Sequence, residues 1–323
     1  MKIIRDPSDD AQQAQNVNVA ASDFFVATPE VDRITRRALA YLKAGYSVHL
    51  SGPAGSGKTT IAFHIAAQLA RPVTMITGDH QMTSADLVGS ASGIRKMRLV
   101  DNYVRSVVRT EEQQTTIWSD NRLTSACRYG HTLIYDEFNR TPPEANTPLL
   151  SVLAEGVLTL PKAHEGTQNF VEVHPDFRAI FTSNPEEYVA VYKAADALLD
   201  RMINVRVDLL DEDTERQIVS SRSGVSPEVA GVIVALIKRA RAIEDGARAS
   251  IRSGIAIARI LASSAASPTP EDEVFRWAVQ DVLHRSLDEL LPMREELIQP
   301  VSTRTEQAAQ VSTQATAKAR SRK

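Results

Sequence analysis

One short stretch of this chain constrains its fold more than any other. Residues 52–59 spell Gly-Pro-Ala-Gly-Ser-Gly-Lys-Thr, the pattern G-x-x-x-x-G-K-[ST], in which a glycine-rich loop follows a strand and begins a helix. The surroundings agree, because the apolar run 46–51 precedes the loop and Ile61, Ile65 and Leu69 follow it at helical spacing. The stretch therefore predicts a phosphate-binding loop on a fold that alternates strands with helices.

The residue types in this phosphate loop (residues 52–59) define its chemistry. Glycines let several backbone N–H groups converge on phosphate oxygens, and the following helix adds the positive end of its dipole. We expect Lys58 to reach the β- and γ-phosphates and the Thr59 hydroxyl to bind Mg²⁺, so ATP and Mg²⁺ are the expected cofactors. The predicted nucleotide-binding residues are Gly52, Pro53, Ala54, Gly55, Ser56, Gly57, Lys58, Thr59 and Thr60.

A second apolar run, residues 133–135, ends in the carboxylates Asp136 and Glu137. Open parallel sheets bind ligands at the carboxyl ends of their strands, where this acidic pair would lie. We expect Asp136 to hold Mg²⁺ together with Thr59, and Glu137 to polarise the attacking water as a general base. Taken alone, the pair fits a solvated acidic turn equally well; downstream of a phosphate loop, hydrolysis is the better interpretation.

Two more polar residues follow predicted strands. Asn184 comes after the run 178–182, where it could orient the lytic water, although Asn before Pro is also typical of a turn. Arg201 follows Leu-Leu-Asp at 198–200. An arginine can complete a neighbouring subunit's site by stabilising charge in the transition state, but its spacing fits a surface charge as well.

The order of strand and helix signals predicts the fold class and the domains. Strands and helices alternate up to residue 208 and helical periods alone follow, which predicts a parallel α/β domain at 23–208 and an α-helical lid at 209–300. Residues 1–22 and the basic segment 301–323 are expected to be a disordered arm and a disordered tail.

Several shorter patterns give testable local predictions. We expect a polar loop at 78–98, helices at 100–111, 120–129 and 143–155, and a hairpin formed by 157–160 and 170–173. Within the second domain we expect helices near 229–240, 255–262 and 274–291.

Composition excludes some classes of protein. A net charge of −3 lacks the basic footprint of a nucleic-acid-binding protein, and no apolar run is long enough to span a membrane. The only cysteine, Cys127, is expected to be buried and inert. With no signal peptide and no possible intramolecular disulfide, the chain is predicted to be cytoplasmic. The histidines show no metal-ligand spacing.

The phosphate loop, the acidic pair, Asn184 and Arg201, in this order, resemble the AAA+ ATPases of the MoxR-like branch over about residues 23–291. The resemblance implies a parallel sheet with a helical lid, and a ring, usually a hexamer, in which Arg201 acts as an arginine finger. Arg140 is the alternative candidate for that role. The segment 250–253 resembles a sensor-2 motif, so Arg252 would touch the γ-phosphate, although Ile251 stands where many relatives have proline.

Three longer stretches, 78–89, 118–123 and 174–188, resemble the gas vesicle protein N family. This implies an ATPase that helps a gas vesicle shell to grow, acting on the shell protein or on other assembly proteins, in the cytoplasm or at the vesicle surface. Neither nucleic-acid binding nor membrane insertion is expected. The alternatives are a MoxR-like activator that inserts metal into or remodels another enzyme, a nucleic-acid motor, and a scaffold that binds nucleotide without hydrolysing it.

Overall fold

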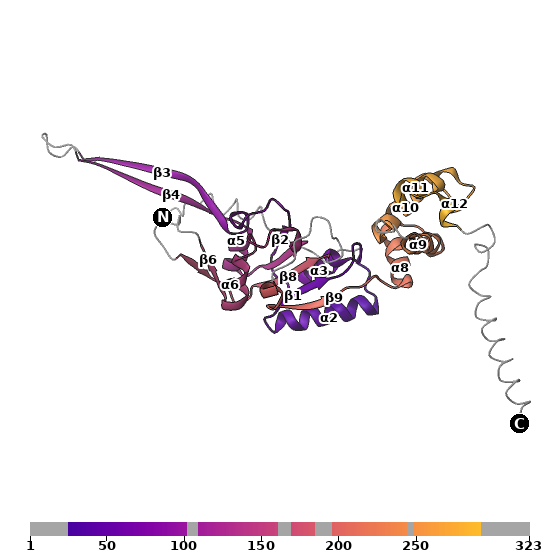
Figure 1. The fold of residues 1–323 in the computed structure, drawn as a ribbon, viewed down its shortest axis with the longest axis horizontal. Helices are drawn as coiled ribbons and strands as arrows, with labels where there is room; N and C mark the ends of the chain where they lie inside the picture. Colours follow the sequence, from indigo (N-terminus) through magenta and orange to yellow (C-terminus); the bar gives the residue numbers. More distant parts are fainter. Residues whose placement is uncertain (1–24, 102–108, 161–168, 185–195, 244–248, 292–323) are drawn as a thin grey trace, which may run out of the picture. The chain divides into compact units, whose positions relative to one another are not determined.

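The computed structural model describes residues 25–101, 109–160, 169–184, 196–243 and 249–291. The chain divides into two compact units, residues 1–218 and 219–323 (Figure 1). The predicted arm at 1–22 and tail at 301–323 lie outside the described residues. Among the helices described, none combines the length and apolar character that crossing a membrane requires.

A five-stranded parallel sheet organises the first unit, with the strand order β2-β5-β8-β1-β9. Because the strands are parallel, all their carboxyl ends lie at one edge, here called the carboxyl edge, and all their amino ends lie at the opposite amino edge. The registers are regular: Tyr135 of β5 pairs with Phe181 of β8, and Ser47 of β1 pairs with Met202 of β9. The strands are β1 (Ser47–Ser51), β2 (Val73–Thr77), β5 (Thr132–Asp136), β8 (Arg178–Ser183) and β9 (Met202–Arg206).

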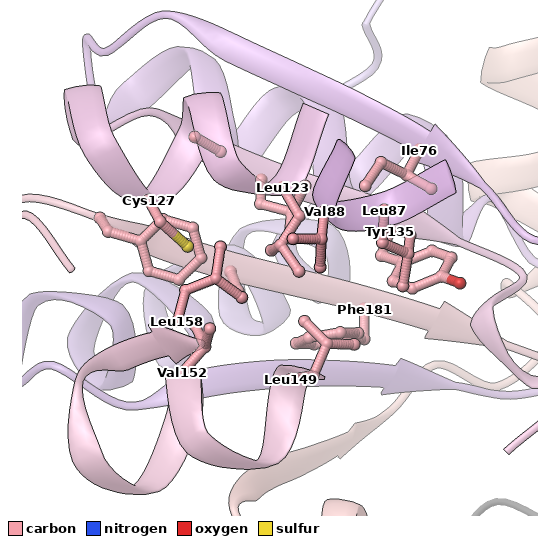
Figure 2. Close-up of a cluster of buried hydrophobic side chains, with 14 of the residues drawn as sticks. Ile76, Leu87, Val88, Leu123, Cys127, Tyr135, Leu149, Val152, Leu158 and Phe181 are labelled. Carbon is pink, nitrogen blue, oxygen red and sulfur yellow. The ribbon is translucent and has the colours of Figure 1, made fainter. Parts of the chain in front are cut away.

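Helices cover the sheet and create two buried cores, so the central strands are buried on both faces. In β5, Leu133 and Tyr135 belong to one core and Ile134 to the other, which explains why this strand is an unbroken apolar run. The core that contains Ile134 also packs α2 (Pro29–Lys43) and α3 (Lys58–Gln68). The core that contains Leu133 and Tyr135, shown in Figure 2, packs α4 (Ser84–Val88), α5 (Arg122–Tyr129) and α6 (Pro148–Glu155).

Local sequence explains where helix α2 begins. Thr28 stands at the extended N-cap of α2, Pro29 occupies its first position, and Glu30 and Asp32 place negative charge in its first turn. The helix then buries residues at helical spacing, including Ile34. The predicted sheet, its main helices and the helical character of the second unit are confirmed, with shifts of a few residues at their ends.

Two hairpins stand apart from the main sheet. The predicted hairpin is confirmed as β6 (Val157–Thr159) paired antiparallel with β7 (Phe170–Glu172). The second hairpin, β3 (Gly89–Asp101) with β4 (Arg109–Asp120), contradicts the predicted helix at both ends of 100–111, and residues 102–108 lie outside the described residues. The valines at 100, 104, 107 and 108 recur at helical spacing, but valine is β-branched and favours strands, and the neighbouring segments pair as a hairpin.

Other predictions were wrong in detail. The predicted loop at 78–98 contains α4, whose Thr83 and Asp86 form a capping box, and the start of β3. The predicted helix at 143–155 forms only as α6, because turns occupy the residues before Pro148. Strand β9 and α7 (Asp196–Leu199) were not predicted.

The described part of the second unit consists of helices. Helix α8 (Glu212–Ser223) contains the division between the units, and α9 (Pro227–Ala242) and α10 (Ile251–Ser264) follow. The predicted helix at 274–291 is broken into α11 (Glu273–Leu283) and α12 (Leu287–Leu290), because His284 has a left-handed backbone with φ of 54°.

Candidate functional site: the carboxyl edge of the sheet

The phosphate loop leaves the carboxyl end of β1 and enters α3, as the motif requires. Gly55 and Gly57 have φ of 78° and 83°, a conformation that costs little only for glycine. Gly52 is needed for a different reason: a Cβ at this position would overlap the carbonyl oxygen of Val207. Two distinct backbone constraints therefore explain why glycine occupies these positions.

Lys58 is buried at the start of α3. Its ammonium donates hydrogen bonds to the carbonyl oxygens of Gly52, at 2.9 Å, and Pro53, at 2.6 Å. A buried ammonium that bonds to the loop lies where it can exchange these carbonyls for phosphate oxygens, which carry more negative charge.

Thr59 and Asp136 meet across the loop and the sheet. The Thr59 hydroxyl donates to Oδ1 of Asp136 at 2.8 Å, although the two residues are 77 positions apart. Asp136 is the last residue of β5, the strand next to β8 in the sheet. The two residues predicted to hold Mg²⁺ are therefore in direct contact.

Glu137 has an unusual backbone, with φ of 52°. A left-handed conformation at a residue other than glycine costs about 1–3 kcal/mol and persists where the surroundings fix it. Gly78 packs so closely that a Cβ there would overlap the carbonyl oxygen of Glu137. The carboxylate pairs with Arg140, whose Nε lies 3.1 Å from its Oε2. Arg140 therefore lies at the carboxyl edge, beside Glu137.

Asn184 follows β8 at the same edge and is buried. Its backbone oxygen accepts a hydrogen bond from Nδ2 of Asn139 at 3.3 Å. Its side-chain Oδ1 is buried without a hydrogen-bond partner among the described residues. A buried polar atom without a partner is costly in a closed protein and is expected where a ligand or water completes the site.

Two residues at this edge were missed by sequence reasoning. Thr182 of β8 donates to Oδ1 of Asp136 and accepts the backbone N–H of Glu137. His49 of β1 forms a hydrogen bond of 2.7 Å with the Ser183 hydroxyl, and burial lowers the pKa of His49 to about 4. The available signal was a polar residue beside apolar residues in each strand, His49 between Val48 and Leu50 and Thr182 after Phe181, since buried polar groups need partners.

Arg201 lies at the opposite edge of the sheet. It directly precedes β9, whose first residue Met202 pairs with Ser47, the first residue of β1. The phosphate loop begins after the last residue of β1, roughly 13 Å away at about 3.3 Å per residue. The Arg201 guanidinium is exposed and donates to the carbonyl oxygen of Ala197. The fold thus separates Arg201 from the phosphate loop of its own chain.

Arg252 belongs to the second unit, in the first turn of α10, where it is exposed. Ser250 and Ser253 form a capping box around this turn. The role of Arg252 at the γ-phosphate stays a prediction, as do the individual catalytic roles of Glu137, Asn184 and Arg201.

The residues at the carboxyl edge fit a Mg²⁺–nucleotide. No side chain among those described caps the N-terminus of α3, so its N–H groups are available for an anion. The Ser56 hydroxyl within the loop is buried without a partner in the described structure. The hydroxyl of Thr59 and the carboxylate of Asp136 are oxygen ligands of the kind that Mg²⁺ prefers.

From the sequence, neither Cys127 nor the histidines were expected to carry out chemistry. Cys127 is buried, and burial raises the pKa of its thiol to about 12, so the thiolate needed for reactivity is disfavoured. Within the described ranges, no cluster of three or more histidines, cysteines and carboxylates is placed to hold a metal ion.

Comparison with known proteins agrees with this geometry. Residues 47–202 match the family model described as AAA domain (dynein-related subfamily). The gas vesicle ATPase GvpN of Ancylobacter aquaticus is 44% identical over 260 residues, which cover 80% of this chain and 72% of that protein. The gas vesicle ATPase GvpN of Haloferax mediterranei is 43% identical over 231 residues, covering 70% of this chain and 66% of that protein.

More distant relatives have other names. Protein CbbQ of Hydrogenophilus thermoluteolus is 28% identical over 210 residues, covering 65% of this chain and 70% of that protein. Among solved structures, NtrX from Brucella abortus, in complex with ADP, superposes with a TM-score of 0.52 at 17% identity, covering 84% of this chain and 60% of that one. At this identity the structural likeness supports the AAA+ fold.

Proposed function

Because this chain belongs to the GvpN family of gas vesicle ATPases, we propose that it is an assembly or remodelling factor that uses ATP hydrolysis in gas vesicle formation. The chain is an AAA+ ATPase. Its client would be the vesicle shell protein or another assembly protein, and it would work in the cytoplasm or at the vesicle surface. The assignment to vesicles rests on the family, and the assignment to hydrolysis rests also on the site.

One observation carries the hydrolytic part of the proposal: the hydrogen bond between Thr59 and Asp136. It joins the phosphate loop to the acidic end of β5 and leaves Glu137 as the next residue at the same edge. In this arrangement Lys58 binds the β- and γ-phosphates, while Thr59 and Asp136 hold Mg²⁺. Mg²⁺ supplies neutralisation of phosphate charge.

The carboxylate of Glu137 then serves as general base toward water, and Asn184 orients that water through its Oδ1. Both groups follow strands that are neighbours in the sheet, β5 and β8. The ion pair with Arg140 holds the Glu137 carboxylate at this edge.

The position of Arg201 supports the proposal of a ring, of which a hexamer is the expected form. Arg201 lies at the amino edge, away from its own phosphate loop, and its side chain is exposed, so an adjacent subunit could approach it. In such a ring Arg201 would enter the site of the adjacent subunit and stabilise the charge that develops on the phosphates.

The direct test is to express a complete vesicle gene set with Lys58→Ala and to measure vesicle number and width. We expect few or only small vesicles, because the variant lacks the phosphate-binding ammonium. The matched control is Lys43→Ala, which removes the same side chain from an exposed position at the end of α2. Vesicles of normal number and width with a hydrolytically dead Lys58→Ala protein would refute ATP use in assembly.

The second candidate is a MoxR-like activator of another enzyme. Its support is similarity to CbbQ, at 28% identity against 44% for the GvpN of Ancylobacter aquaticus. Gene context separates the two functions cheaply: small shell and accessory genes favour vesicle assembly, whereas a von Willebrand A-domain gene beside a metalloenzyme gene favours the activator.

A further inference from the structure

One buried hydroxyl connects the two acidic residues of the site. The Thr182 Oγ1 donates to Oδ1 of Asp136 and accepts the backbone N–H of Glu137 at 2.9 Å. Thr182 lies on β8 and the acidic residues end β5, so these two hydrogen bonds cross between neighbouring strands. Thr182 is 1% exposed, so bulk water has little access to replace either hydrogen bond.

The same hydroxyl supports the unusual backbone of Glu137. On its carbonyl side, Glu137 accepts the backbone N–H of Arg140 at 2.9 Å and is approached closely by Gly78. On its amide side, the partner is Thr182. Removal of the hydroxyl would take away the amide-side support, and residue 137 could then relax toward a commoner backbone conformation, which would redirect its carboxylate.

Asp136 depends on Thr182 in a different way. Its Oδ1 accepts two hydroxyl donors, Thr59 from the phosphate loop and Thr182 from β8. In the proposed site the Thr59 hydroxyl also binds Mg²⁺, whereas no contact with the metal or the nucleotide is proposed for Thr182. The Thr182 donor therefore fixes the orientation of the carboxylate independently of what the phosphate loop does.

We propose that Thr182 is a positioning residue for ATP hydrolysis, whose hydroxyl holds the Asp136 carboxylate and the Glu137 peptide in their working arrangement. The inference rests on the proposed roles of Asp136 and Glu137. Among residues of this size, threonine and serine supply a hydroxyl that both donates and accepts, and valine copies the shape of threonine with neither capacity.

The test compares Thr182→Val and Thr182→Ser in the full chain. Because the lost hydrogen bonds involve a charged group, we expect Thr182→Val to lower kcat by about 10- to 100-fold, with KM for ATP changed less than about threefold. Thr182→Ser is expected to keep most of the activity. A second readout, independent of turnover, is binding of a fluorescent ATP analogue with Mg²⁺ and with EDTA.

In EDTA, Thr182→Val should bind the analogue as the unaltered chain does, and it should lose part of the gain in affinity that Mg²⁺ gives. The matched control is Thr132→Val on β5. Thr132 is also fully buried in the sheet, but among the described residues its hydroxyl has no hydrogen-bond partner. This control should leave kcat and the Mg²⁺-dependent gain unchanged.

The outcomes separate the possibilities. Unchanged kcat and Mg²⁺ dependence in Thr182→Val would overturn the proposal, and so would a loss in Thr182→Ser as large as that in Thr182→Val. If Thr182→Val does not fold while Thr132→Val does, the role of the hydroxyl is structural and the proposal is wrong. Absence of turnover in the unaltered chain would instead refute the proposed function, and the Mg²⁺-dependent binding would still test Thr182.

Discussion

The two edges of the central sheet differ in how their polar groups are satisfied. At the carboxyl edge, Ser56 and Asn184 have buried side-chain oxygens without partners among the described residues, and Glu137 has a strained backbone. At the amino edge, Thr74 of β2 forms a hydrogen bond of 3.0 Å with His131 and Arg71 pairs with Asp176, while the hydroxyl of Thr132 has no partner among the described residues.

This difference shows how one sheet keeps its ligand site apart from polar groups that pair within the protein. Parallel strands direct all their carboxyl ends to one edge, so a ligand site gathers there, while polar side chains at the amino edge can pair with one another, as Thr74 and His131 do. Unsatisfied groups and strain cost stability, and they are tolerated where a ligand compensates for them. Arg201 is the exception, since it brings a candidate functional group to the amino edge.

The largest expected effect tests that exception. Arg201→Ala should lower ATP turnover by about 10³-fold or more, because an arginine finger stabilises transition-state charge by that order. Arg33→Ala, at an exposed position on α2, serves as the control and should be neutral.

If Arg201 acts on a neighbour, mixing Arg201→Ala with Glu137→Gln should restore part of the activity. In a mixed ring, an Arg201→Ala subunit keeps its own Glu137 and receives Arg201 from the Glu137→Gln subunit beside it. Two inactive proteins that stay inactive when mixed, although they assemble together, would argue that Arg201 does not act in trans.

The next effect concerns the carboxyl edge itself. Glu137→Gln keeps the size of the side chain and removes its basicity, so kcat should fall about 10²- to 10⁴-fold while ATP still binds. Steady-state turnover and binding of a fluorescent ATP analogue check both parts. Turnover equal to that of the unaltered chain would mean that another group activates the water.

A smaller effect is expected on the free energy of unfolding when the pH is lowered. Burial lowers the folded-state pKa of His49 to about 4, below its ordinary value of 6.5, so the unfolded state binds more protons between these values. The stability from neutral His49 is complete above pH 6.5 and is lost as pH falls toward 4. We expect a loss of about 2 kcal/mol between pH 7.5 and 5.

Urea unfolding at several pH values measures this loss. His49→Gln stays neutral throughout, so its free energy of unfolding should change less over the same interval. An equal pH dependence in both proteins would assign the titration to other groups.

The smallest effect concerns the amino edge. Gly130 has φ of 70° and a Cβ there would overlap the ring of His174. Gly130→Ala should therefore lower the free energy of unfolding by about 1–2 kcal/mol for the left-handed conformation, plus the cost of moving the His174 ring, and kcat should not change. Gly156→Ala is the control, since Gly156 has φ of 68° but open space around its Cβ position, so it should cost less. A fall in kcat with Gly130→Ala would show that the amino edge influences the site at the carboxyl edge, contrary to the separation of the two edges.

The sequence predicted the candidate site better than it predicted the surroundings. Lys58, Thr59 and Asp136 were found because their motifs are short, local and tied to one chemistry, and the structure brings them together. The helix predicted at 100–111 was wrong because a hairpin depends on pairing between segments, which no local window reveals. His49 and Thr182 were missed because their importance arises from partners on other strands.

The sequence by itself determined the kind of ligand and the class of fold. Glycines at positions that need unusual backbone angles, a lysine, a threonine and two carboxylates after a strand specify a site for Mg²⁺ and a triphosphate in almost any context. The tertiary structure decided which groups surround that site. Only the strand order β2-β5-β8-β1-β9 brings Thr182 to Asp136 and Glu137 and leaves Arg201 at the opposite edge, because strand neighbours are set by long-range packing rather than by adjacent residues.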